Sequence, residues 1–126
     1  MIFDMDRIFH NGQNSLPVVH VLASSPGKVE LALDLARDIC WFEGHFPGHP
    51  ILPGVAQLDW VVRLARLHLR DVEAEATECQ VKFRSVLTPD RPLTLTLELI
   101  AEKSRLGFTF VSGDRICSEG WMALAQ

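Results

Sequence analysis

Residues 44–69 read GHFPGHPILPGVAQLDWVVRLARLHL, and within this stretch a segment full of structure breakers turns into a helix. The first eleven positions, 44–54, hold three glycines and three prolines, a density that predicts a rigid loop of special shape. From Pro53, which suits a first helical turn, a helix of roughly four to five turns is expected. Apolar residues recur in it at steps of three and four, and this stripe is expected to face the core: Val55, Leu58, Val62, Ala65 and Leu69.

Strand-like segments flank this helix on both sides. Residues 17–23 and 28–35 are rich in apolar and β-branched residues, and the Ser-Ser-Pro-Gly turn at 24–27 predicts an antiparallel hairpin between them. One long helix among mainly antiparallel strands indicates an α+β fold in which the sheet wraps around the helix. Four further strand-like runs follow the helix, at residues 78–87, 93–100, 106–113 and 115–125.

Composition narrows the possible classes of protein. A chain of 126 residues predicts one domain, spanning residues 1–126, and its net charge of −4 does not suit a nucleic-acid-binding protein. No apolar run is long enough to span a membrane, and the N-terminus does not resemble a signal peptide. The three cysteines include no CxxC pair, which favours reduced thiols in a cytoplasmic protein and small buried apolar roles for them.

Two residues of the loop and helix carry possible chemistry. Asp59 lies next to Leu58, near the side of the helix expected to face the core, where an ionised carboxylate is costly unless it is hydrogen-bonded. It is either a functional carboxylate or a structural residue, namely a cap or a partner for a buried arginine. His45 lies in the constrained Gly/Pro loop; a lone histidine is usually structural or exposed, but a loop this rigid often carries function.

Other kinds of site fit the sequence poorly. His45 and His49 are four residues apart, but Pro47 and Pro50 exclude the helix that would place both rings on one metal ion. Neither a GxSxG turn nor a phosphate-binding glycine loop is present. We therefore expect neither a metal site nor a bound cofactor.

The loop and three further segments resemble one enzyme family. Residues 42–55, FEGHFPGHPILPGV, resemble the GHFPxxPxxPG motif of the β-hydroxyacyl-(acyl carrier protein) dehydratases of bacterial fatty acid synthesis. Residues 81–84 and 88–90 resemble that family's KFRxxVxPGD segment, and residues 113–125 its last strand. The resemblance implies the hotdog fold, a curved antiparallel sheet around one helix. The stretch FEGHFPGHPILPGVAQLDWV is most similar to the small dehydratases of aryl polyene gene clusters.

The resemblance also implies roles for individual residues. His45 matches the catalytic histidine of the family and Asp59 its catalytic carboxylate. The Gly54 N–H matches the donor to the thioester oxygen, and the Ile51 carbonyl matches the group that orients the histidine. Around these, the histidine-orienting and tunnel positions include Phe46, Val55 and Arg63, the last standing where relatives usually have glutamine.

Partners follow from the same resemblance. Such enzymes act on substrates linked through phosphopantetheine to an acidic acyl carrier protein, so basic residues near the tunnel entrance are candidate contacts, or else ordinary solvated charges: Arg66, Arg70, Lys82 and Arg84. A homodimer is implied, with a heterodimer or a larger assembly as alternatives. Dehydration of a 3-hydroxyacyl thioester is the expected activity. A hotdog thioesterase and a catalytically silent subunit of a heterodimeric dehydratase stay open as alternatives.

Overall fold

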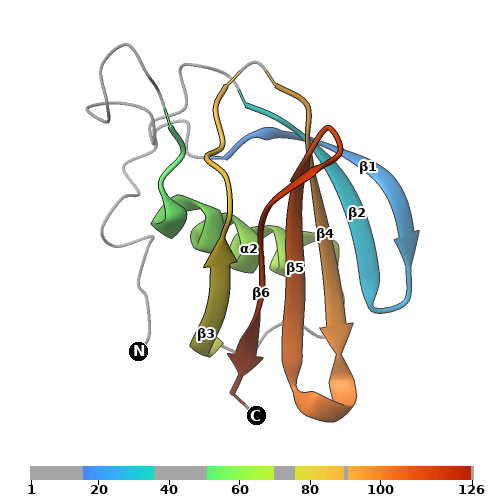
Figure 1. Cartoon of the computed structure of the whole chain (residues 1–126). Helices are drawn as coiled ribbons and strands as arrows, with labels where there is room; N and C mark the ends of the chain where they lie inside the picture. Colours follow the sequence, from blue (N-terminus) through green and yellow to red (C-terminus); the bar gives the residue numbers. More distant parts are fainter. Residues whose placement is uncertain (1–15, 36–50, 70–75, 90, 126) are drawn as a thin grey trace.

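A computed structural model describes residues 16–35, 51–69, 76–89 and 91–125 of the protein. Its strands form one antiparallel sheet in the order β1-β2-β4-β5-β6-β3, and the helix α2 lies in the hollow of that curved sheet (Figure 1). This confirms the predicted α+β class and hotdog architecture. The elements are β1 (Val18–Ser25), β2 (Lys28–Asp34), α2 (Gly54–His68), β3 (Ala76–Phe83), β4 (Leu93–Ile100), the 3-10 turn η2 (Ala101–Lys103), β5 (Arg105–Ser112) and β6 (Arg115–Leu124).

The predicted hairpin between the first two strands is confirmed. Ser25 pairs with Lys28, and the turn between them uses Gly27 at φ 78°, a left-handed conformation that favours glycine. In β2 and β4 the side chains alternate, so that Leu31, Leu95 and Leu97 face the helix while their neighbours face away.

The strand predicted at 78–87 ends earlier, at Phe83. The backbone N–H groups of Arg84 and Ser85 both donate to the carbonyl oxygen of Cys117, at 2.7 and 3.0 Å, so the chain leaves the regular ladder there. The pairing of β5 and β6 also shifts at this place: Val111 pairs with Ile116 but Phe110 with Ser118, so Cys117 is the extra residue of a β-bulge.

The helix itself is confirmed, but two details of the prediction are wrong. Pro53 is the N-cap rather than a residue of the first turn. Val55, Leu58 and Val62 are only half-buried, because the helix presents a neighbouring face to the sheet. The buried helix residues are Ala56, Gln57, Asp59, Trp60, Val61, Leu64 and Ala65.

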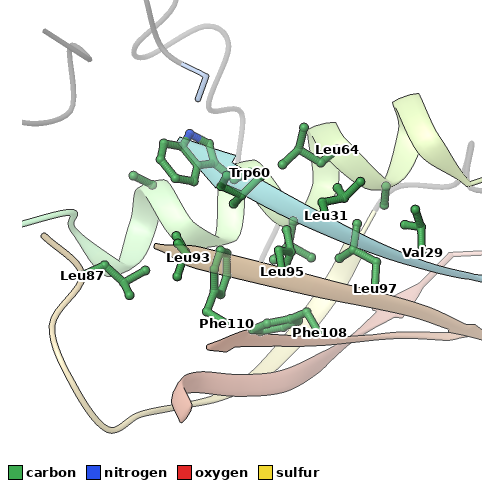
Figure 2. Packing of buried hydrophobic residues seen from close by; sticks show 14 of the residues in the cluster. Val29, Leu31, Trp60, Leu64, Leu87, Leu93, Leu95, Leu97, Phe108 and Phe110 are labelled. Atoms are coloured by element: carbon green, nitrogen blue, oxygen red, sulfur yellow. The ribbon is translucent and has the colours of Figure 1, made fainter. Parts of the chain in front are cut away.

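The core lies between that helix face and the concave face of the sheet. In Figure 2, Trp60 and Leu64 extend from the helix, and Leu31, Leu95 and Leu97 rise from the strands toward it. All five side chains are essentially inaccessible to water. This packing holds the helix in one position on the sheet, and with it the residues at the start of the helix.

Candidate active site

The segment that leads into the helix is fastened to the sheet. The Leu52 N–H donates to the Leu87 carbonyl oxygen at 2.8 Å, and the Leu52 side chain is buried in the core. The Pro53 carbonyl then accepts hydrogen bonds from the N–H groups of Ala56 and Gln57, which starts the helix. The predicted site residue Ile51 is half-buried directly before this anchor.

Gly54 is the first residue of α2. N–H groups in a helix's first turn have no acceptor within the helix and form its electropositive end, so they suit developing negative charge. The ring of Phe83 crosses this position closely: a Cβ atom at Gly54 would lie 2.7 Å from the Phe83 Cζ. Glycine therefore lets the ring approach the start of the helix.

Asp59 lies a little over one turn further along the helix, about 7–8 Å from Gly54 along the axis at the standard helical rise. It is 4% exposed, and its Oδ2 accepts a hydrogen bond from the Arg63 Nη1 at 3.1 Å. The Arg63 side chain is 24% exposed. The arginine compensates the buried carboxylate, an arrangement that serves either a structural ion pair or a carboxylate fixed for catalysis.

The remaining predicted residues lie in different places. Val55 is half-buried next to Gly54, whereas Arg66 and Lys82 are exposed. Arg84 is exposed too, and its Nε donates to the Glu119 Oε2 at 3.1 Å. His45, Phe46 and Arg70 lie outside the described residues. Of the predicted residues, Ile51 thus lies just before the helix, Gly54, Val55 and Asp59 lie in its N-terminal half, and Arg63 reaches Asp59 from one turn further along.

Two buried polar residues at this end of the helix were missed by sequence reasoning. Gln57 is 3% exposed and Ser118 fully buried, and the Ser118 hydroxyl donates to the Gln57 Oε1 at 2.7 Å. The available signal for Gln57 was its spacing: it precedes the apolar Val61 by four residues and Leu64 by seven, which places all three on one face of the helix. Ser118 had no comparable signal, because the bulge at Cys117 turns it inward.

A cavity of about 470 Å³ is lined in part by Leu87, the residue that anchors Leu52. It is lined by neither Asp59 nor Gly54. It is formed by the chain after β3 and by residues at or near the ends of β2, β4, β5 and β6, and these include two arginines and several hydroxyl groups: Leu35, Ser85, Val86, Leu87, Thr88, Arg91, Leu93, Ser112, Asp114, Arg115 and Cys117.

The described residues hold no group of three or more His, Cys, Asp or Glu side chains placed to bind a metal ion. Across the same ranges, no helix is long and apolar enough to cross a membrane. Cys79 and Cys117 are free thiols.

Solved structures and characterised relatives point to dehydratases. The dehydratase heterocomplex ApeI:P from Xenorhabdus doucetiae matches with a TM-score of 0.80 at 32% identity, over 87% of this chain and 98% of that chain. An uncharacterized protein from Erwinia carotovora subsp. atroseptica matches with a TM-score of 0.75 at 36% identity, over 87% of this chain and 96% of that one. A thioesterase superfamily member from Mus musculus, 11% identical with a TM-score of 0.65, shares the fold alone.

Sequence comparison agrees. The 3-hydroxyacyl-[acyl-carrier-protein] dehydratase FabZ of Levilactobacillus brevis is 32% identical over 74 residues, which cover 53% of this chain and 50% of that protein. The chain thus aligns with about half the length of this relative. The model of the ApeI-like family, described as ApeI dehydratase, matches residues 22–121. The chain belongs to the ApeI-like dehydratase family.

Proposed function

We propose that this dehydratase converts 3-hydroxyacyl-(acyl carrier protein) to trans-2-enoyl-(acyl carrier protein) in fatty acid or polyene biosynthesis. The observation that carries the proposal is the buried Asp59 carboxylate, held by Arg63 a little over one turn after Gly54. A carboxylate and a helix N-terminus in this relation supply two of the groups that elimination of water from a thioester requires. The similarity to a FabZ named for this reaction supports it.

The reaction removes a proton from C2 and the hydroxyl group from C3, so a base and an acid must flank adjacent carbons. We assign the base to His45, whose neutral imidazole takes the C2 proton. Asp59 in its carboxylic acid form donates a proton to the C3 hydroxyl, directly or through a water molecule that it holds, so that the hydroxyl leaves as water; the proton taken up by His45 then returns to Asp59 through solvent. Negative charge gathers on the thioester oxygen, where the Gly54 N–H and the positive end of the helix stabilise it.

The neighbouring residues have supporting roles in this proposal. The Ile51 carbonyl orients the imidazole of His45, and Phe46 and Val55 border the acyl chain. Arg63 holds the Asp59 carboxylate in one position through the 3.1 Å hydrogen bond. Fixed positions matter because a displacement of about 1 Å at a reacting group costs up to 10²-fold in rate.

The substrate is proposed to arrive on phosphopantetheine attached to an acyl carrier protein. The exposed side chains of Arg66 and Lys82 offer positive charge for an acidic carrier, and Arg70 and Arg84 are further candidate contacts. Part of the charge of Arg84 is already compensated by Glu119.

We further propose a dimer, with one domain per chain over residues 1–126 and a cytoplasmic location. The half-buried helix residues Val55, Leu58 and Val62, beside the half-exposed ring of Phe83, are an apolar strip that a second chain can cover. A second copy of the chain is the simplest occupant. A different chain is the alternative, since the related ApeI:P assembly is a heterocomplex by its name.

Mass spectrometry of a 3-hydroxyacyl-carrier protein, incubated with the wild type, His45→Ala and Asp59→Asn, tests the reaction. The wild type is expected to remove the mass of one water from the acyl group, and both variants to leave the substrate unchanged. Loss of the entire acyl group would identify a thioesterase instead. An unchanged substrate with the wild-type protein alone, converted only after a partner chain is added, would identify a silent subunit of a heterodimer.

A further inference from the structure

A buried polar pair lies directly behind the helix start. The Gln57 side chain is enclosed by the helix, by β6 and by the segment leading into the helix, with 3% of its surface exposed. Its Oε1 accepts the Ser118 hydroxyl at 2.7 Å, which leaves its Nε2 directed at the Leu52 carbonyl oxygen, 3.4 Å away. The first contact is a strong hydrogen bond and the second a long, weaker one.

The Ser118 hydroxyl reaches Gln57 because β6 is bulged. Both Cys117 and its neighbour Ser118 are buried, although a regular strand would turn them to opposite faces. The Cys117 carbonyl oxygen meanwhile binds the N–H groups of Arg84 and Ser85. The bulge therefore anchors the segment after β3 and aims one hydroxyl group at the helix.

Leu52 is held from both sides as a result. Its N–H donates to the Leu87 carbonyl oxygen at 2.8 Å, and its own carbonyl oxygen receives the Gln57 amide. Ile51 and Gly54 lie one and two residues from this anchor, so a change in the orientation of the Leu52 peptide moves the Ile51 carbonyl and the Gly54 N–H. Burying an amide and a hydroxyl is costly compared with apolar side chains of similar shape, so this pair is not an economical way to gain stability.

We propose that Gln57, oriented by Ser118, is a positioning residue that fixes the Leu52 peptide and thereby aims the Gly54 N–H at the thioester oxygen. The inference rests on the proposed dehydration. Gln57 itself touches no reacting atom in it.

The test is the double variant Gln57→Met/Ser118→Ala in the full chain. It removes the donor and the acceptor of the Gln57–Ser118 hydrogen bond together, and the Leu52 carbonyl oxygen loses only the long 3.4 Å contact, so only a small loss of stability, seen as a small fall in melting temperature, is expected. The matched control is Gln80→Met/Ser24→Ala, the same chemical changes at exposed positions of the two edge strands β3 and β1. Thermal unfolding, steady-state dehydration of a 3-hydroxyacyl-carrier protein, and hydrogen exchange of peptides covering residues 51–58 and β4 are measured for both.

The expected result is a fall in kcat of about 10-fold or more with KM within about 2-fold of wild type. The variant misplaces the Gly54 N–H relative to the thioester oxygen in the transition state but leaves substrate binding intact. Exchange should accelerate at residues 51–54 and stay unchanged in β4, and the control should match the wild type throughout. Wild-type kcat and unchanged exchange in the double variant would overturn the inference. An inactive wild type would refute the proposed reaction, and the exchange data would still decide whether the pair fixes the Leu52 peptide.

Discussion

The two ends of the layer between helix and sheet differ in chemistry. Toward the C-terminal half of the helix, Leu64 belongs to the same apolar cluster as Val29, Leu31 and Leu97, whose side chains rise from the strands on the helix side of the sheet (Figure 2). The N-terminal half carries the buried polar side chains of the described residues: Gln57 and Asp59 on the helix, and Ser118 on β6 in contact with Gln57. Burial at the apolar end stabilises the folded protein. Burial of polar groups at the other end stabilises it less, but their hydrogen bonds hold the side chains in fixed orientations.

This difference explains why one helix can both hold the fold and carry a site. Hydrophobic contacts have no strict direction, so the apolar half tolerates small shifts. The hydrogen bonds of Asp59 and Gln57 depend on distance and angle, so they weaken strongly when the groups move by about 1 Å. The apolar half should therefore control stability, and the polar half should control activity.

The largest stability effect is expected for Leu97→Ala, in the apolar half. Leu97 is fully buried, and truncating such a leucine costs about 2–5 kcal/mol through lost burial and the cavity left behind. The free energy of unfolding is measured by urea titration. Leu67→Ala is the control, because the Leu67 side chain is 68% exposed and should change stability by less than about 0.5 kcal/mol. Equal losses in the two variants would contradict the assignment of the core.

A smaller effect is expected for Arg63→Ala, in the polar half. Removing the guanidinium leaves the buried Asp59 carboxylate without its 3.1 Å hydrogen bond. Breaking a fully buried pair costs more, but Arg63 is partly exposed, so about 1–2 kcal/mol is expected in urea unfolding. Arg84→Ala removes a pair with Glu119 of the same length at an exposed site, and should cost under about 1 kcal/mol. A larger loss of unfolding free energy for Arg84→Ala than for Arg63→Ala would contradict this prediction.

The smallest effect is a titration at the edge of the apolar half. Burial raises the pKa of the Cys79 thiol above its ordinary value of 9.0. The unfolded chain therefore loses this proton at a lower pH than the folded protein. The stabilisation is fully present below pH 9.0 and is lost as the pH rises through the higher folded value. Between about pH 8 and about pH 10, the melting temperature should decrease less for Cys79→Ala than for the wild type. An equal decrease in the two proteins would show that the thiol is exposed to water.

Most of the fold could be predicted from the sequence, because local patterns of residue type determine where its helix and strands lie. The Gly/Pro density ending at Gly54 located the start of the helix, and alternation located β2 and β4. The side of the helix that is buried could not be read in the same way. Val55, Leu58 and Val62 form as good a periodic stripe as the residues that are in fact buried, and only packing against the sheet decides between them.

The site was predictable where the residue type itself was unusual for its place. Asp59 stood out as a carboxylate near the core, and its burial is confirmed. Its contact with Arg63 lies one helical turn away and was within reach of sequence reasoning. The Gln57–Ser118 pair was not, because it joins residues 61 positions apart through a bulge that depends on the register of β5 and β6.

The most direct test of the central claim is the dehydration rate of Asp59→Asn on a 3-hydroxyacyl-carrier protein. Asp34→Asn, an exposed aspartate of β2, is the matched control. We predict that kcat falls about 10²-fold or more for Asp59→Asn, in a protein that still folds, and stays at the wild-type value for Asp34→Asn. A rate within about 3-fold of wild type in folded Asp59→Asn would show that the buried carboxylate is only the structural partner of Arg63.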